Sequence, residues 1–275
     1  MVASTNLAPC HYPRVFRVLR ARYVSRCVAG YLGANWAHRP AGYSDAMPQA
    51  ALVVDAVLFD MDGTLVDSNA VVDQMWTEFA VNFDLDPQAV RTFAHGTPST
   101  STLRRFLPAH EGFDEWFERL ASWETGLFGE VSEVPGAIHA VRMLPPERWA
   151  VVTSALREAA LIRLETVGFP SPHILIGADD VSNGKPDPEG FRAAARALDV
   201  DPTRCVVFED SPAGLEAALS LGAQAVVVGT LAAEVTRGLR RIVDWNDVVF
   251  TRTADGGIGI KGIPLPHEGL DTSGN

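Results

Sequence analysis

The chain has 275 residues, of which 47% are hydrophobic, and a formal net charge of −11. This length and apolar content suffice for one core domain with a smaller inserted domain. The acidic balance argues against a nucleic-acid partner. No apolar run approaches the roughly 18 residues that span a bilayer, so no membrane partner is expected. Cys10, Cys27 and Cys205 have no metal-ligand spacing and cannot all pair, which favours a reducing cytoplasm.

Residues 1–50 are expected to be a basic N-terminal extension outside the fold. Residues 1–46 contain six arginines and a single acid, Asp45, in contrast to the acidic remainder. A transit peptide is basic and poor in acids in this way, but serine is scarce here and glycine breaks the short apolar stretch. The alternative is that Met47 is the true start of the protein. Both interpretations stay open.

The organising stretch is the apolar run 51–59 with the acidic turn that follows it. A Val-rich run without alternation, closed by turn residues, is typical of a parallel strand that is covered on both faces. Asp60 and Asp62 then lie at the sheet edge where open α/β sheets bind ligands. Two such close carboxylates repel each other and are costly to desolvate, which predicts a cation beside them. A calcium loop of the EF-hand kind is excluded, because Val71 stands where its glutamate is required.

Residues 68–134 change to helical spacing of apolar side chains, which predicts an inserted bundle of three or four helices. Asp86-Pro87 and Thr97-Pro98 resemble helix starts, each with a capping residue before a proline. His95 and Arg104 stand out as polar residues in this segment. Their roles are open, and a structural histidine is the alternative for His95.

From residue 135 onward, predicted strands alternate with predicted helices, which indicates βαβ units and a parallel sheet. The strands are expected at 149–153, 173–178, 205–208 and 225–229, the helices at 156–167, 189–198 and 212–221, and a last edge element at 242–250. The fold class is therefore α/β: a Rossmann-like parallel-sheet core with an inserted α-helical cap. The expected boundaries are 1–50 for the extension, 51–67 and 135–250 for the core, 68–134 for the cap, and 251–275 for an irregular Gly- and Pro-rich tail.

Four predicted strand ends and loops bring polar residues to one edge of the sheet, and phosphoryl transfer to a carboxylate needs such a set. Asp60 can attack phosphorus as a nucleophile. Asp62 can donate a proton to the leaving alcohol if a neighbouring carboxylate raises its pKa. The Thr153 hydroxyl and the Ser154 amide, at a helix N-terminus, can bind phosphate oxygens.

The remaining expected members of this site are a cation and a metal site. Lys185 is one of only two lysines among 23 basic residues, so a lysine here indicates a chemical need for a compact positive charge. Asp210, together with Asp60 and Asp62, completes a set of hard oxygen ligands for Mg2+. Glu209 is left outside the expected metal set, although it could bind Mg2+ directly or through water.

The four motifs DMDGT, VVTS, GKPDP and VVFEDSPAG resemble, in order and spacing, those of the haloacid dehalogenase (HAD) superfamily, in its sugar-phosphatase and β-phosphoglucomutase-like subgroup. The resemblance covers residues 54 to about 230. It implies that Asp60 becomes an aspartyl-phosphate, that Asp62 is the general acid and base, and that Mg2+ lies beside both. The chain departs from the subgroup at Ala155, commonly glycine, and at Thr97, often lysine or arginine.

The expected function is a Mg2+-dependent phosphatase, acting as a monomer on a small phosphorylated sugar or polyol. A β-phosphoglucomutase-like mutase shares all four motifs and is the first alternative. A mutase cap should offer a cationic site for a distal phosphate, whereas residues 95–99 contain no lysine or arginine. A non-catalytic phosphate-binding regulator is the second alternative, and it would be expected to lose an acid or the lysine.

A chain that starts at Met47 should remain soluble and active, because residues 1–46 supply neither a predicted strand nor a motif. The thermal unfolding transition and the phosphatase activity of the truncated and full-length chains would be compared. Loss of the transition on truncation would show that the extension is part of the fold.

Overall fold

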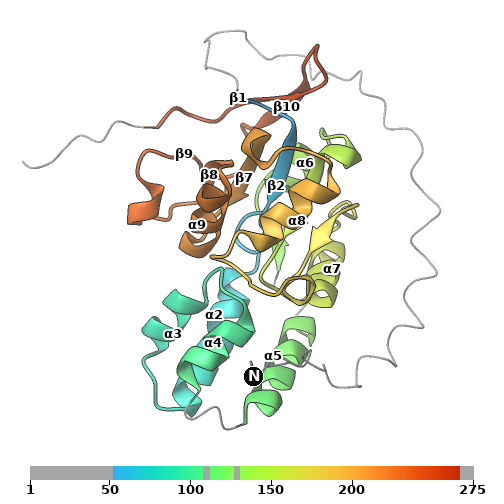
Figure 1. Ribbon diagram of the computed structural model, residues 1–275. Helices are drawn as coiled ribbons and strands as arrows, with labels where there is room; N and C mark the ends of the chain where they lie inside the picture. The colour runs from blue at the N-terminus through green and yellow to red at the C-terminus, as the bar shows by residue number, and fades with distance from the viewer. Residues whose placement is uncertain (1–51, 108–111, 127–130, 267–275) are drawn as a thin grey trace, which may run out of the picture. The chain divides into compact units, whose positions relative to one another are not determined.

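The computed structural model describes residues 52–107, 112–126 and 131–266, so the predicted extension 1–50 lies outside the described residues. Its centre is a parallel sheet of six strands, which confirms the predicted α/β class (Figure 1). In spatial order the strands are β6 (Leu175–Ile176), β5 (Trp149–Val152), β2 (Ala56–Phe59), β7 (Cys205–Glu209), β8 (Gln224–Val228) and β9 (Arg240–Ile242). Among the described residues, none of the helices is both long and apolar enough to cross a membrane.

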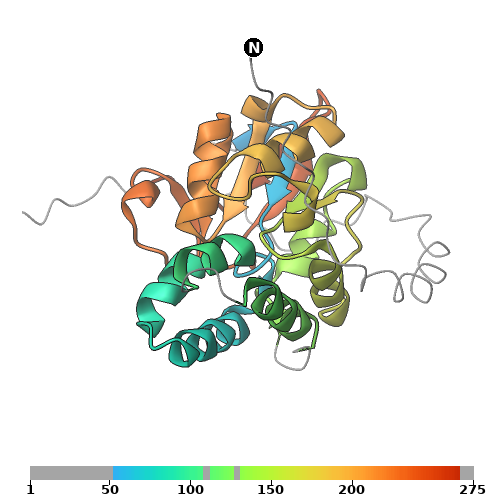
Figure 2. The same ribbon diagram turned by 60° about the horizontal axis from the view of Figure 1, so that its bottom comes forward.

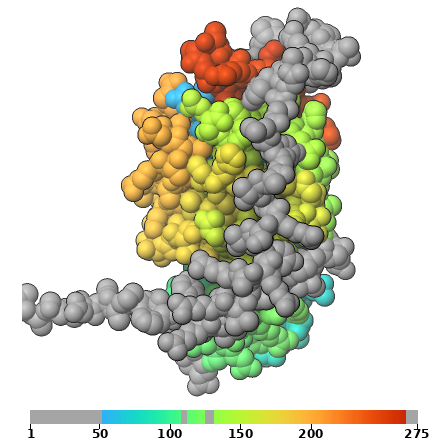
Figure 3. Space-filling view, turned by 90° about the vertical axis from the view of Figure 1, so that its right-hand side faces the viewer, coloured from blue at the N-terminus to red at the C-terminus, as the bar shows by residue number. Residues whose placement is uncertain are grey.

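Strand β2 lies in the middle of the sheet and is buried on both faces. Val57 and Phe59 join one apolar cluster with the helices α6 (Ala137–Val141) and α7 (Arg157–Thr166). Ala56 and Leu58 join a second cluster on the other face, under α8 (Glu189–Ala197) and α9 (Pro212–Leu221). Figure 3 shows the side of the molecule that carries the segments around α6 and α7, in green to yellow. Coverage of both faces explains why the strand sequence is apolar without alternation.

The chain order places a switch point at the end of β2. From β2 the chain continues to β5 and β6 on one side, and it then crosses to β7, β8 and β9 on the other. The strand order therefore runs in opposite directions on the two sides of β2. Sheets of this kind bind ligands in the crevice at the carboxyl end of such a strand.

The apolar run 51–59 is not one strand, because it divides at Asp55. The amide of Asp55 donates to the Arg204 carbonyl at 2.8 Å, while β1 (Leu52–Val54) leaves the central sheet and pairs with β11 (Ile258–Lys261). Strand β10 (Val249–Arg252) completes this antiparallel sheet of three strands. The expected irregular tail is therefore wrong over residues 251–261. Its glycines serve a hairpin, in which Gly256 adopts a φ of 87° at the turn.

Four described helices form the cap, which comes forward in Figure 2 in cyan to green. They are α2 (Asn69–Asn82), α3 (Pro87–Ala94), α4 (Ser99–Phe106) and α5 (Phe113–Gly126), and the chain enters and leaves through the antiparallel pair β3 (Val66–Asp67) and β4 (Ser132–Glu133). The cap has an apolar core of its own, separate from the two sheet clusters, in which Phe79, Leu103 and Leu120 are fully buried.

The two predicted cap-helix starts have different outcomes. Asp86 caps α3, since its carboxylate accepts from the Gln88 amide at 2.9 Å and Pro87 follows at the first helical position. Thr97 is not the cap of α4. That helix begins at Ser99, and Pro98, with an extended ψ of 141°, is the capping residue. The proline thus precedes the helix here and does not occupy its first turn.

Trp245 ties the aromatic core to the loop that follows β2. Its indole Nε1 donates to the Thr64 carbonyl at 2.8 Å, and its ring lies 5.4 Å from that of Phe59. Trp245→Phe removes this bond and should lower the free energy of unfolding by about 1–2 kcal/mol, with a loss of activity because the loop that follows β2 loosens. Trp149→Phe is the matched control, since that ring also packs against Phe59. Activity and urea unfolding would be measured for both variants. Equal losses of activity in the two variants would contradict the prediction.

Candidate active site

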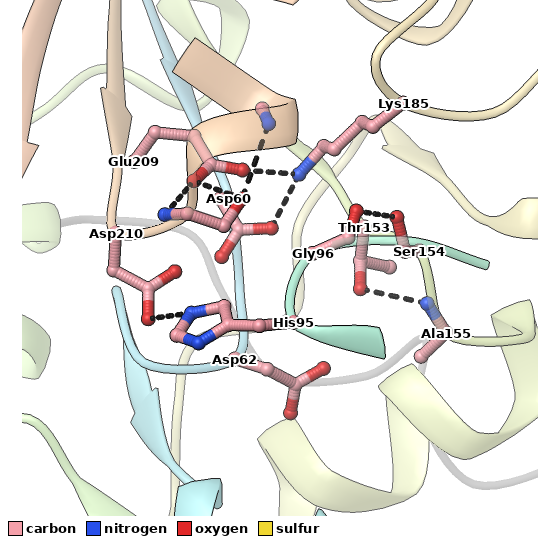
Figure 4. A network of polar contacts seen from close by, with 12 residues as sticks. Asp60, Asp62, His95, Gly96, Thr153, Ser154, Ala155, Lys185, Glu209 and Asp210 are labelled. Carbon is pink, nitrogen blue, oxygen red and sulfur yellow. Dashed lines mark hydrogen bonds and ion pairs between the residues drawn. The ribbon is translucent and has the colours of Figure 1, made fainter. Parts of the chain in front are cut away.

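The predicted polar residues meet at the carboxyl edge of the sheet (Figure 4). Asp60 follows β2, and its amide extends the ladder by donating to the Phe208 carbonyl at 3.0 Å. Thr153 follows β5, and Glu209 and Asp210 lie at the end of β7. Lys185 comes from the loop between β6 and α8. Residues far apart in the sequence are thus brought together because parallel strands end at one edge.

Lys185 lies between two of the acids. Its Nζ is 2.5 Å from Asp60 Oδ1 and 2.7 Å from Glu209 Oε1, and all three side chains are buried. Burial lowers the pKa of Lys185, but the neighbouring Asp60 and Glu209 carboxylates outweigh it and raise the pKa above its ordinary value. The lysine therefore stays charged and holds one oxygen of Asp60 in a fixed place.

Glu209 is held by the first turn of α9. The amide and hydroxyl of Ser211 donate to Glu209 Oε2 at 2.5 and 2.8 Å. Gly214 leaves the space for this carboxylate, since a Cβ there would stand 1.6 Å from Glu209 Oε1. With its charge fixed in this way, Glu209 orients Lys185 toward Asp60.

Three buried acids offer a place for a metal ion. Carboxylate oxygens of Asp60, Glu209 and Asp210 all lie within 4.8 Å of one another. Asp60 Oδ2 is buried without a hydrogen-bond partner among the described residues. Burial raises the pKa of Asp60 well above its ordinary value, and the charges of Glu209 and Asp210 add to that. An orphaned oxygen in such a cluster fits a hard divalent cation such as Mg2+, which would favour the ionised form.

Asp62 lies outside this cluster. Both oxygens of its carboxylate accept from Arg163 Nη1, at 2.8 and 2.9 Å, and Oδ1 also accepts from Ser68 Oγ at 2.5 Å. Figure 4 shows the Asp62 carboxylate turned away from Lys185. The carboxylate set therefore differs from the one expected from the sequence, with Glu209 in the place of Asp62.

Thr153 and Ser154 adjoin the cluster, and their hydroxyl groups have separate partners. Thr153 Oγ1 accepts from the Ala155 amide at 3.1 Å. Ser154 Oγ donates to the carbonyl of Gly96, in the cap, at 2.7 Å. The Ser154 hydroxyl thus joins the core to the cap, and the expected binding of phosphate by this pair stays a prediction.

The cap loop reaches the acids through His95. Its Nε2 lies 2.9 Å from Asp210 Oδ2, and this hydrogen bond, against the effect of burial, raises the pKa of His95 to about 9. Gly96, with a φ of 73°, permits the approach, because a Cβ there would stand 2.0 Å from Ser211 Oγ. Arg104 is exposed and lies 5.9 Å from the centre of the Phe113 ring. Of the two polar cap residues singled out in the sequence, His95 is the one that contacts the acids.

Sequence reasoning missed Arg163 and Glu124, which lie at the junction of core and cap. Both residues occupy positions on the apolar faces of their helices, and this placement could have identified them from the sequence. Glu124 continues the four-residue spacing of the buried Trp116 and Leu120, and Arg163 lies on the buried face of α7 beside Leu164. A charged residue in such a register needs a buried partner.

Comparisons with known proteins identify similar hydrolases and phosphatases. A family model described as "Hydrolase: haloacid dehalogenase-like hydrolase" matches residues 54–222. Hexitol phosphatase A of Escherichia coli is 35% identical over 175 residues, covering 62% of this chain and 81% of that protein. Glycerol-1-phosphate phosphohydrolase 2 of Saccharomyces cerevisiae is 33% identical over 192 residues, covering 66% and 76%. The crystal structure of CbbY from Rhodobacter sphaeroides in complex with phosphate matches with a TM-score of 0.54 and 25% identity, covering 69% and 93%.

The contact between His95 and Asp210 predicts a pH dependence of stability in chelator. Because the folded-state pKa of His95 is raised from 6.5 to about 9, the contact stabilises the fold fully below pH 6.5 and is lost as the pH rises to 9. The urea midpoint in EDTA should therefore fall across this range, and fall less in His95→Gln. His173→Gln, at an exposed histidine, is the control and should behave as wild type. Parallel pH curves for wild type and His95→Gln would contradict the prediction.

Proposed function

The chain belongs to the haloacid dehalogenase-like hydrolase family, and we propose that it is a Mg2+-dependent phosphatase of a small phosphorylated sugar or polyol. Hydrolysis of phosphate monoesters is the reaction in the names of its relatives hexitol phosphatase A and glycerol-1-phosphate phosphohydrolase 2. The observation that carries the proposal is the buried Asp60 carboxylate, with one oxygen on Lys185 and the other without a partner in residues 52–107, 112–126 and 131–266.

In the proposed reaction, a carboxylate oxygen of Asp60 attacks the phosphorus of the substrate. The bond between phosphorus and the ester oxygen breaks, and Asp62 gives a proton to the leaving alkoxide, which departs as an alcohol. Water then attacks the aspartyl-phosphate on Asp60 and loses its proton to Asp62. Inorganic phosphate leaves, and both carboxylates return to their starting state.

The other residues serve to bind and orient. Lys185 keeps Asp60 in place and offers positive charge to the phosphoryl oxygens, and the Thr153 hydroxyl and Ser154 amide are proposed to bind two of those oxygens. Mg2+, held by Asp60 and Asp210 beside Glu209, would supply further positive charge to the phosphoryl group. The contacts of Gly96 and His95 with the core bring the cap over this edge and limit the access of water.

Asp60→Asn should abolish turnover, by about 10³-fold or more, while the protein stays folded, because the amide keeps the shape and removes the nucleophile. Asp67→Asn is the matched control, since Asp67 is an exposed acid seven positions along in β3. Activity would be measured as phosphate release and folding by thermal unfolding. Near-normal release by a pure Asp60→Asn protein would end the covalent mechanism.

A panel of hexose and polyol phosphates should give steady phosphate release with Mg2+ and none in EDTA, without a bisphosphate activator. The reason is that the cap loop 95–99, which meets the core, carries no lysine or arginine to hold a distal phosphate. Conversion of β-glucose 1-phosphate to glucose 6-phosphate faster than free phosphate appears would replace this function with a mutase. Full activity in EDTA would remove the metal from the proposal.

A further inference from the structure

We infer that Arg163 is a positioning residue for Asp62, and that Glu124 of the cap is the counter-ion that holds Arg163 in place. The carboxylate that transfers the proton would thereby be anchored to the core and to the cap at once. The inference rests on the proposed function, since it concerns the proton donor of that reaction.

Arg163 binds Asp62 through direct hydrogen bonds. The Arg163 side chain is only 7% exposed, and its Nη1 donates to both Asp62 oxygens at 2.8 and 2.9 Å. Charge-assisted bonds of this length are among the stronger ones in proteins. With Ser68 as a third donor, the direction of the Asp62 carboxylate is fixed by a helix 101 positions away in the sequence.

Glu124 lies near the other terminal nitrogen of the same guanidinium. It comes from the cap helix α5, its side chain is only 8% exposed, and its Oε2 lies 3.9 Å from Arg163 Nη2. Ser99 donates to Oε1 at 2.8 Å, whereas Oε2 is buried without a hydrogen-bond partner in the part of the chain that the structure describes. Burial raises the pKa of Glu124, and the charge of Arg163 opposes that rise. A buried carboxylate in an apolar stripe is costly, and the nearby guanidinium is what offsets its cost.

The position of Asp62 relative to Asp60 decides whether it can serve the leaving group. In an in-line displacement the leaving oxygen lies opposite the attacking oxygen of Asp60. Figure 4 shows Asp62 below Asp60, on the side where His95 of the cap enters. A proton donor must be held within hydrogen-bond reach of the leaving oxygen, and small displacements cost much of the rate.

The test compares two leaving groups in the same variant. An alkyl phosphate, the one that wild type hydrolyses best, needs a proton for its alkoxide, whereas p-nitrophenyl phosphate releases a stable anion without one. Because kcat/KM reports the steps up to the aspartyl-phosphate, its ratio for the two substrates isolates proton donation. A fraction of misfolded protein lowers both values by the same factor and leaves the ratio unchanged.

Arg163→Met should lower kcat/KM for the alkyl phosphate about 10- to 100-fold more than for p-nitrophenyl phosphate. Arg163→Lys should bring the ratio of the two kcat/KM values part of the way back to that of wild type, since it restores a donor to Asp62. Glu124→Gln should change the ratio in the same direction as Arg163→Met, but by a smaller factor. Arg196→Met, at an exposed arginine of α8, should leave the ratio unchanged.

Equal losses on both substrates, or no loss on either, would overturn the inference and leave the proposed function standing. A wild-type protein that releases phosphate from neither substrate would instead overturn the proposed function, and the inference with it.

Discussion

The site depends on one lysine among three buried carboxylates. Asp60, Glu209 and Asp210 meet at the end of adjacent strands, and Lys185 contacts the first two at 2.5 and 2.7 Å. Each buried charge costs several kcal/mol unless it is paired, and the cluster is paired by this lysine, by the donors of Ser211 and by His95 on Asp210. The compact ammonium fits between two acids where a planar guanidinium would need more room. The acids of the cluster outnumber its cations, and this excess of negative charge makes the cluster suitable for a divalent cation.

Close packing of backbone around this cluster explains the glycines of the motifs. A Cβ at Gly63 would stand 1.8 Å from Asp210 Oδ2, and one at Gly184 would stand 2.2 Å from Pro98 in the cap. Gly96 approaches Ser211 in the same way. Side chains at these positions would push the acids apart or keep the cap away from the core. The glycines therefore set both the spacing of the charges and the closeness of the cap to the core.

The sequence predicted the parts of the fold whose signals are local. Apolar runs and helical spacing located the central strands and the cap helices, and the motif at Asp60 located the carboxyl edge of the sheet. The hairpin at 249–261 was missed because its glycines mimic an irregular tail, and its pairing with β1 joins residues some 200 positions apart. The contacts of Arg163 and Glu124 were missed for a similar reason. They are formed between helices of different domains, and no spacing within one helix encodes them.

The two aspartates of the first motif also differ in a way that spacing alone conceals. Residues two positions apart on an extended strand point to the same side. Here the chain turns at once, since the Gly63 amide donates to the Val66 carbonyl at 2.7 Å and Leu65 donates to Met61 at 2.8 Å. Asp60 therefore faces Lys185, and Asp62 faces Arg163. The acids that raise the pKa of Asp60 are Glu209 and Asp210, which are distant in sequence. A tight turn thus gives each aspartate its own counter-ion, and one motif can supply a nucleophile and a separate proton donor.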